Sequence, residues 1–182
     1  MSGRPVMIEN KRIYLKQLAV TDITDAYINW LNDPEVNRFL SVRGGAQDRQ
    51  MVEKYVASYD GDDNRLLLGI FDKASRKHIG NITFSSINRR SGVGAIGIAI
   101  GDKSFWGKGY GSEALQAAVD LAFAVLKLRR VEAGINAENA ASISLFNKAG
   151  FVEEGRLKER EKFGDRYVDF LWFGLLKDGK RQ

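Results

Sequence analysis

A glycine-rich turn within residues 103–115 constrains the fold more than any other part of this chain. The segment, K-S-F-W-G-K-G-Y-G-S-E-A-L, joins two apolar stretches. The stretch before it, residues 96–100, alternates isoleucine with glycine or alanine, and the stretch after it stays apolar to about Lys127. The order is therefore strand, tight turn and helix.

Three glycines, Gly107, Gly109 and Gly111, make this turn suited to a phosphate. Glycine tolerates positive φ and places no side chain between the backbone and a bulky anion. The following helix directs its unpaired N–H groups and the positive end of its dipole toward the turn. A dinucleotide-binding fingerprint that began at Gly107 would require glycine where the chain has Ser112, and a Walker-type loop finds no match. A turn that only connects strand to helix is the plain alternative.

Composition indicates one soluble globular domain, residues 1–182, large enough to bury a substantial core. Hydrophobic residues make up 44% of the chain and charged residues 28%, which argues against disorder. Cysteine is absent and the first twelve residues contain no apolar signal segment, so we expect a cytoplasmic protein without a membrane partner. The net charge is +5 with basic and acidic residues interleaved, which argues against a nucleic-acid partner.

Residue periodicity predicts an N-terminal part with one strand and three helices. These are a strand at 13–17, a helix at 23–31 capped by Thr21 or Asp22, a short helix at 34–40 after Asp33, and a helix at 47–59. The period then changes to three strands, at 65–72, 78–88 and 92–100, which short turns can join as antiparallel hairpins. His78, the only histidine, stands beside one of these turns, where we expect it to be exposed rather than catalytic.

The pattern continues after the glycine turn. The predicted elements are a helix at 109–127, a strand at 131–135, a helix capped by Asn139 and ended by Gly150, and a closing hairpin of 151–161 and 166–176. If the first of these helices is a crossover, the strand at 131–135 lies parallel to the strand before the turn.

The strand before the turn has one apolar face and one nearly bare face. Isoleucines at 96, 98 and 100 share the first face, while Gly97, Ala99 and Gly101 share the other. The bare face indicates either close packing of another element or room for a ligand along the backbone.

At this point the residues resemble a known family. The turn at 106–114 resembles the acetyl-CoA motif of the GCN5-related N-acetyltransferases (GNAT), and residues 139–151, N-A-A-S-I-S-L-F-N-K-A-G-F, resemble the second conserved block of that superfamily. Tyr14-Leu15, residues 30–35 and residues 167–169 extend the likeness to the RimJ/RimL-type branch. These two motifs stand about 30 residues apart in the right order of strand and helix. They favour the family over the interpretation of the segment as a turn that only connects strand to helix.

The resemblance implies both a fold and an activity. The fold is α/β (α+β): a mixed, mostly antiparallel, twisted sheet of six to seven strands, with helices on both faces and a splayed central parallel pair. The activity is that of an N-acetyltransferase, an acyltransferase of the EC 2.3.1 type, which moves an acetyl group from acetyl-CoA to a primary amine by direct attack. It implies no metal.

Cofactor-binding residues follow from the resemblance by position. The backbone at Ile98, Ala99 and Ile100 would hydrogen-bond the pantetheine arm of coenzyme A. Main-chain N–H groups of the turn would cradle the pyrophosphate; its residues are Trp106, Gly107, Lys108, Gly109, Tyr110, Gly111 and Ser112. Asn139 and Phe146 complete the set. Lys148 stands near the phosphates by position, although a residue that answers the helix dipole is the more ordinary interpretation.

Direct attack requires an unprotonated amine, a stabilised oxyanion and a proton for the leaving thiolate. A backbone N–H near Ile98 or Ala99 can serve the oxyanion. Phe146 stands where relatives often place a tyrosine acid, and Ala95 stands where many RimJ/RimL-type relatives carry glutamate. Ser142 is the nearest hydroxyl by family position and is the catalytic candidate, although its ordinary role is the third residue of its helix. A thiol with a pKa of about 8.5 could also leave unaided, and water could take the amine proton.

The acceptor site should form between the first helices and the last hairpin, with Trp30, Arg43 and Tyr167 as candidates. The resemblance leaves several amines open: protein N-termini, amino-sugar nucleotides, antibiotics and polyamines. Arg43 and the basic balance favour an anionic acceptor over a polyamine. We expect a small-molecule or peptide amine as substrate and a monomer or homodimer. A non-catalytic acyl-CoA-binding module is the alternative, suggested by Phe146 and Ala95.

Overall fold

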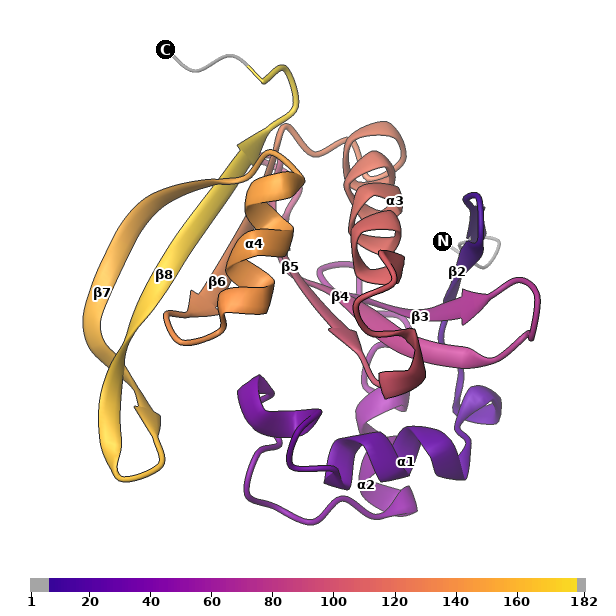
Figure 1. Cartoon of the computed structure of the whole chain (residues 1–182). Helices are drawn as coiled ribbons and strands as arrows, with labels where there is room; N and C mark the ends of the chain where they lie inside the picture. Colours follow the sequence, from indigo (N-terminus) through magenta and orange to yellow (C-terminus); the bar gives the residue numbers. More distant parts are fainter. Residues whose placement is uncertain (1–6, 180–182) are drawn as a thin grey trace.

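The computed structural model of this chain describes residues 7–179, which form one mixed eight-stranded sheet with helices on both faces (Figure 1). The strands are β1 (Met7–Glu9), β2 (Ile13–Gln17), β3 (Leu66–Asp72), β4 (His78–Asn88), β5 (Val93–Ile100), β6 (Arg130–Asn136), β7 (Val152–Phe163) and β8 (Arg166–Leu176). The helices are α1 (Asp25–Asn32), α2 (Arg49–Ala57), α3 (Tyr110–Ala124) and α4 (Ala140–Lys148), with short 3-10 helices η1 (Val20–Asp22), η2 (Asn37–Phe39) and η3 (Lys103–Phe105).

The strand order is β1-β2-β3-β4-β5-β6-β8-β7. Neighbouring strands are antiparallel except β5 and β6, which are parallel because α3 carries the chain back over the sheet between them. The predicted fold class is confirmed. The sheet has one strand more than the six to seven expected, because the three-residue β1 is too short to show a periodic pattern.

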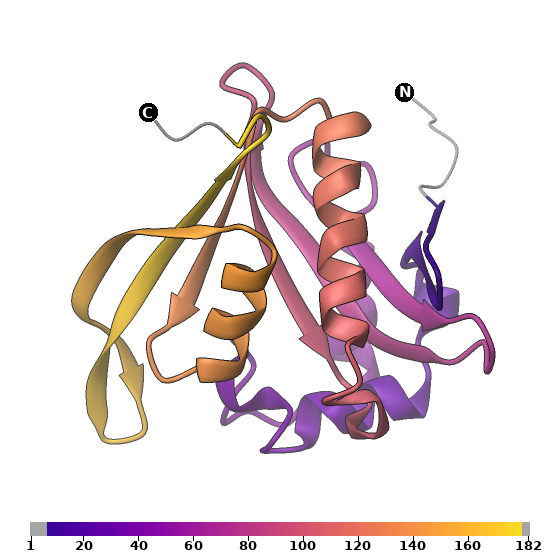
Figure 2. The same ribbon diagram turned by 45° about the horizontal axis from the view of Figure 1, so that its top comes forward.

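The parallel pair is short. Its register runs only from Val93 opposite Arg130 to Ala95 opposite Glu132. Beyond these residues β5 and β6 move apart toward their carboxyl ends, as Figure 2 shows. The sheet therefore opens at its centre, at the ends of two strands that α3 and α4 follow (Figures 1 and 2).

Two cores hold the layers together. The larger lies between the sheet and the helices α3 and α4; its fully buried side chains include Leu15, Phe84, Leu115, Ala118 and Val131. The smaller lies on the other face, under α1 and α2, and includes Tyr27, Val52, Val56, Leu67 and Phe71. Burial of apolar side chains on both faces fixes the strand register, because a shift by one residue would expose them. Among residues 7–179, no helix is both long enough and apolar enough to span a membrane.

The N-terminal helices differ in detail from the prediction. Thr24, rather than Thr21 or Asp22, caps α1, because its side chain accepts from the N–H of Tyr27 at 3.2 Å. The carboxylate of Asp22 instead closes η1 by accepting from the N–H of Ala19 at 2.9 Å. The predicted helix at 34–40 is wrong in extent, because this segment is turns around the three residues of η2.

The expectation that His78 is exposed is wrong, since its exposed fraction is 8%. α1 covers this end of β4, and the imidazole lies among Tyr27, Trp30 and Phe71, with ring centroids 5.2, 5.0 and 4.9 Å away. Its Nε2 lies 2.9 Å from the carbonyl oxygen of Gly80, which requires a proton on that nitrogen. Burial lowers the pKa of His78, so the neutral imidazole is a core residue of the smaller cluster.

Candidate active site

The backbone of β5 beyond Ala95 faces the opening at every second residue. The N–H of Gly101 donates to the carbonyl of Ile79 on β4 at 2.9 Å, and Ala99 pairs with Asn81. Because antiparallel strands alternate their hydrogen-bonding sides, Ile98 and Ile100 turn their N–H and C=O groups away from β4. β6 has already diverged there, so these groups face the gap.

Trp106 already uses one of these groups. Its indole Nε1 donates to the carbonyl oxygen of Ile100 at 2.8 Å. This bond ties the start of the glycine turn to the last residue of β5. Trp106 therefore fixes the turn beside the open strand end.

Close packing, the first explanation offered for the bare face of β5, applies at two of its glycines. A Cβ at Gly101 would overlap the ring of Trp30, so this glycine is needed for close packing of α1. At Gly97 such an atom would lie 2.9 Å from the hydroxyl oxygen of Thr83, which is also too close. Trp30 thus packs on the sheet at the end of β5.

The glycine turn has the open backbone that a phosphate requires. Gly107 and Gly109 have φ values of +70° and +83°, and Gly109 is the N-cap of α3. No atom lies within 4 Å of the position that a Cβ at Gly107 would occupy. The amide groups of the first turn of α3 point toward this loop. The residues of the turn therefore fit a diphosphate. The spacing of the glycines in the sequence predicted this turn.

Arg12 supports the turn from a distant part of the sequence. Its Nη1 donates to the carbonyl of Lys108 at 3.0 Å, and its Nε lies 2.9 Å from Oε2 of Glu113. Its guanidinium also lies 4.3 Å from the ring centre of Tyr110. Burial opposes ionisation of Glu113, yet the N–H and guanidinium of Arg12 lower the pKa of that carboxyl group. Sequence reasoning missed Arg12, because no local pattern could reveal a contact between residues 96 positions apart.

α4 begins at the same open end. The side chain of Asn139 accepts from the N–H of Ser142 at 3.1 Å, which makes Asn139 the N-cap of α4. The N–H of Asn139 donates to the carbonyl of Asn136, the last residue of β6, at 2.9 Å. Phe146 is 3% exposed and packs on Phe151, so its ring belongs to the core. Asn139 and Ser142 thus lie beside the end of β6.

The segment 33–43 spans the mouth of the opening. At one end Lys103, which follows β5, pairs with Asp33 at 2.7 Å and with Glu35 at 3.0 Å. The hydrogen bond from Lys103 lowers the pKa of Asp33. At the other end Arg43 Nη2 donates to the carbonyl of Lys162, on the last hairpin, at 2.6 Å. The segment therefore reaches from the end of β5 to the tip of the β7–β8 hairpin.

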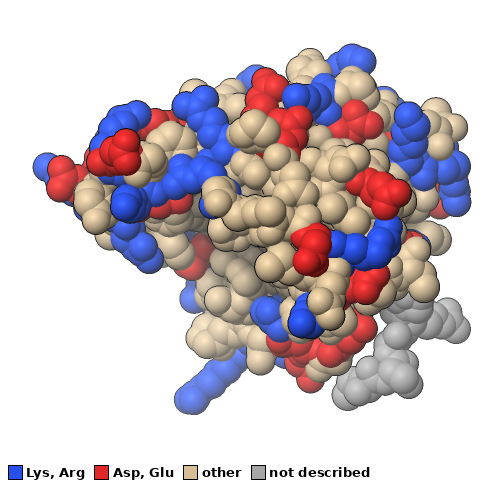
Figure 3. Space-filling model, turned by 90° about the horizontal axis from the view of Figure 1, so that it is seen from below, with Lys and Arg blue, Asp and Glu red and all other residues tan. Residues whose placement is uncertain are grey.

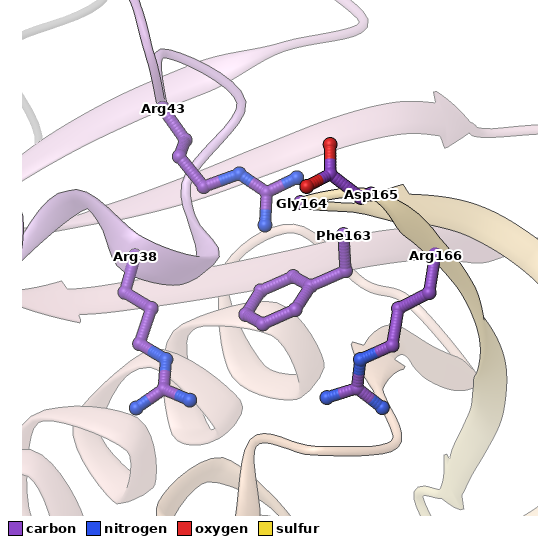
Figure 4. A pocket seen from close by; sticks show the side chains of 6 residues that line it. All are labelled: Arg38, Arg43, Phe163, Gly164, Asp165 and Arg166. Atoms are coloured by element: carbon purple, nitrogen blue, oxygen red, sulfur yellow. The ribbon is translucent and has the colours of Figure 1, made fainter.

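The hairpin itself is anchored to the end of β6. Nδ2 of Asn136 donates to Oε2 of Glu161 at 2.8 Å, and Arg166 pairs with Glu138 at 2.5 Å. Between segment 33–43 and the hairpin lies a hollow of about 600 Å³ (Figure 4). Its lining residues are Arg38, Arg43, Phe163, Gly164, Asp165 and Arg166.

Comparison with known proteins identifies the family. A family model described as an acetyltransferase (GNAT) domain matches residues 12–152. The uncharacterized N-acetyltransferase p20 of Bacillus licheniformis is 34% identical over 171 residues, which cover 92% of this chain and 94% of that protein. The probable N-acetyltransferase YjcK of Bacillus subtilis is 32% identical over 187 residues, which cover 97% of this chain and 100% of that protein.

The chain belongs to the GNAT acetyltransferase family.

Solved structures agree with this fold. Spermidine N-acetyltransferase from Vibrio cholerae, in complex with CoA and spermine, superposes with a TM-score of 0.84 at 23% identity and covers 93% of this chain and 98% of its own. A GNAT-family acetyltransferase from Bacillus anthracis gives a TM-score of 0.82 at 22% identity, with 95% and 99% covered. The chain is thus an N-acetyltransferase, and acetyl-CoA is the acetyl donor in its family.

The GNAT fold brings the cofactor-binding candidates together but leaves the acceptor candidates apart. The backbone of Ile98 and Ile100, the glycine turn and the start of α4 lie at one open end. Of the acceptor candidates, Arg43 lines the hollow, Trp30 packs on the sheet, and Tyr167 is 63% exposed on the hairpin. Figure 3 shows this end with basic and acidic side chains interspersed around an uncharged, hollowed area.

Proposed function

We propose that this acetyltransferase moves the acetyl group of acetyl-CoA to a primary amine by direct attack, as a single domain of the RimJ/RimL-type branch. The observation that supports this most is the backbone of Ile98, which faces the gap between β5 and β6 beside a glycine turn. The acceptor is a small-molecule amine, an amino-sugar nucleotide or a protein N-terminus. We expect a cytoplasmic monomer or homodimer.

The cofactor would be held mainly by backbone. The backbone groups of Ile98 and Ile100 that face the gap would bind the pantetheine arm, with Asn139 beside it, since Ala99 pairs with β4 and the Phe146 ring lies in the core. The amides of Trp106, Gly107, Lys108, Gly109, Tyr110, Gly111 and Ser112 would hold the diphosphate. Bound acetyl-CoA supplies an acetyl group that is already activated as a thioester. The exposed loop with two left-handed glycines supports this assignment.

The side chains available for proton transfer are few. We assign the oxyanion donor to the N–H of Ile98, which faces the gap, rather than to that of Ala99, which pairs with β4. Ser142 is the candidate proton donor to the leaving sulfur, because the helix cap uses its N–H and not its hydroxyl. Water takes the proton of the attacking amine. Ser142→Ala should then lower kcat without weakening coenzyme A binding.

A non-catalytic acyl-CoA-binding module is the second candidate. Phe146 supplies no proton at the position where relatives often place a tyrosine, and its ring is buried against Phe151. This alternative predicts saturable cofactor binding without turnover of any amine.

Two measurements on the purified chain test the proposal. Calorimetry should detect coenzyme A binding, and a thiol-release assay with acetyl-CoA should show turnover on at least one class of primary amine. Binding without turnover on amino sugars, peptides and polyamines would favour the binding module. A folded protein that gives no heat with coenzyme A would refute both candidates.

A further inference from the structure

The hollow between segment 33–43 and the β7–β8 hairpin has an aromatic floor. Phe39 and Phe163 stack with ring centroids 5.3 Å apart and an interplanar angle of 14°. Phe39 belongs to the N-terminal segment and Phe163 to the hairpin. The stacked pair therefore joins two parts of the chain that are far apart in sequence.

Two arginines lie against this aromatic pair. The guanidinium of Arg43 is 4.3 Å from the ring centre of Phe163, and that of Arg38 is 5.1 Å from Phe39 and 5.6 Å from Phe163. Figure 4 shows both side chains on the lining of the hollow, with Arg166 on the far side of Phe163. A guanidinium on an aromatic face keeps N–H donors available for a planar anion.

The charges around the hollow do not balance. Arg166 pairs with Glu138, and Asp165 is the carboxylate of the lining. Within residues 7–179, neither Arg38 nor Arg43 has a carboxylate within ion-pair distance. The lining thus carries three arginines and one carboxylate, and Glu138 beside it pairs with Arg166. A polycationic amine would meet net positive charge here, whereas an anionic group would find two guanidinium groups without ionic partners.

The hollow also adjoins the open strand end. Alternate residues of a strand share a face, so Glu161 and Phe163 project from β7 on the same side. Glu161 accepts from Asn136 at the end of β6, and Phe163 lies under Arg43. Glu161 and Phe163 therefore connect the carboxyl end of β6, which borders the gap proposed for acetyl transfer, to Arg43.

We propose that the acceptor of this enzyme is an amine that also carries an oxyanionic group, a phosphate or a carboxylate, and that Arg38 and Arg43 bind this group over the Phe39–Phe163 pair. The inference rests on the proposed function, because it places the amine end toward the gap between β5 and β6. It separates this chain from the similar structure solved with spermine, whose ligand is a polycation.

The test compares matched amines that differ only in charge. The phosphate arm uses glucosamine 6-phosphate and glucosamine; the carboxylate arm uses the dipeptide Ala-Ala and its C-terminal amide; spermidine is the cationic comparator. For each, kcat/KM is measured by thiol release, and Kd by calorimetry in the presence of coenzyme A. The anionic member of at least one pair should be preferred by about tenfold to hundredfold, as expected for charge-assisted hydrogen bonds.

Variants assign the preference to the hollow. Arg38→Gln combined with Arg43→Gln should bring the two members of the preferred pair within about threefold, because use of the anionic amine falls more than use of the neutral amine. Arg89→Gln is the matched control, because Arg89 lies on the β4–β5 turn, where it donates to the carbonyl of Asp63. This variant removes one positive charge, as each substitution of the double variant does, and should keep the preference for the anionic amine.

Each outcome supports or overturns the inference. The inference is overturned if the anionic member is preferred in neither pair, or if spermidine is used as well as the best anionic amine. A preference that survives the double variant also overturns it. If no amine is turned over, the calorimetric Kd values decide, and binding that ignores the anion overturns it. Absence of coenzyme A binding counts against the proposed function instead, and the amine Kd values still test the hollow.

Discussion

The two sides of the central opening are built from different parts of the chain. On the proposed cofactor side, the groups that would face a ligand are backbone amides of β5, the glycine turn and the first turn of α3. On the acceptor side they are side chains, arginines and phenylalanines from segment 33–43 and from the β7–β8 hairpin. The same open strand end thus presents a backbone surface to one substrate and a side-chain surface to the other.

The difference shows what each side can vary. Backbone recognition depends on conformation, so it tolerates changes of side chain but requires glycine where φ is positive. Side-chain recognition depends on chemical identity, so a few substitutions near Arg43 can change the acceptor without altering the fold. This division can be tested from both sides.

The largest effect should come from the backbone of β5. Ile98→Pro removes an N–H that faces the gap but no hydrogen bond to β4. We expect kcat to fall by about 100-fold to 1,000-fold, as for the loss of one oxyanion donor. Ile98→Val keeps the N–H and should stay within about threefold of the parent. Circular dichroism and thermal melting establish folding, and a folded proline variant that keeps full activity would contradict the assignment.

A matched pair of glycines compares the two sides directly. Gly107 in the cofactor turn has φ +70°, Gly44 near the hollow has φ +81°, and at neither does any atom lie within 4 Å of the position that a Cβ would occupy. Alanine therefore adds only backbone strain, about 1–2 kcal/mol, at either site. Gly107→Ala should raise the Kd for coenzyme A about tenfold with the amine KM unchanged. Gly44→Ala should raise the amine KM and leave the Kd for coenzyme A unchanged. The reverse pattern would contradict the assignment of the glycine turn to the cofactor and of the hollow to the amine.

Most elements of the cofactor side could be predicted because their signals are local. Asn139 lies next to the helix that it caps, and Gly150, with φ +89°, lies just after the end of that helix. The turn glycines and the parallel β5–β6 pair follow from residues within one strand–helix–strand unit. In such a unit the hydrogen bonds and the hydrophobic period are properties of neighbouring residues.

The acceptor side depended on contacts that no local pattern contains. Arg43 reaches Lys162 across 119 positions, and Lys103 reaches Glu35 across 68. Arg43 was a candidate from the sequence, but no pattern there indicated Arg38 or the stacked phenylalanines. The exposure of His78 was predicted wrongly for the same reason, because α1 covers it only after the chain has folded.

Arg12 gives a smaller test of the cofactor side. Arg12→Gln removes the ion pair with Glu113 and the hydrogen bond to the carbonyl of Lys108. The turn should loosen, and the Kd for coenzyme A should rise about fivefold, in line with about 1 kcal/mol for one hydrogen bond. Arg12→Lys keeps the charge but cannot make both contacts, so it should not restore affinity. Full affinity in the lysine variant would show that charge matters there rather than support of the turn.

The smallest effect should be a pH dependence of stability that originates at His78, which lies under α1. Burial lowers the pKa of His78, although its hydrogen bonds to Asn81 and Gly80 oppose the shift. In the unfolded chain the pKa is about 6.5, so below that pH the unfolded state takes up a proton that the folded state resists. Stability should therefore fall as the pH drops below about 6.5 toward the lower folded value.

Because His78 is the only histidine, its ring resonance in an NMR titration is unambiguous. The folded protein should titrate below a pH of about 6.5, and hydrogen exchange at a pH of about 5.5 should show α1 losing protection while α3 keeps it, since α1 packs on the imidazole through Trp30. A His78 pKa at or above about 6.5, or equal loss of protection in both helices, would contradict the expectation. Selective loss in α1 would show that acid loosens the helix that precedes segment 33–43 before it disturbs α3.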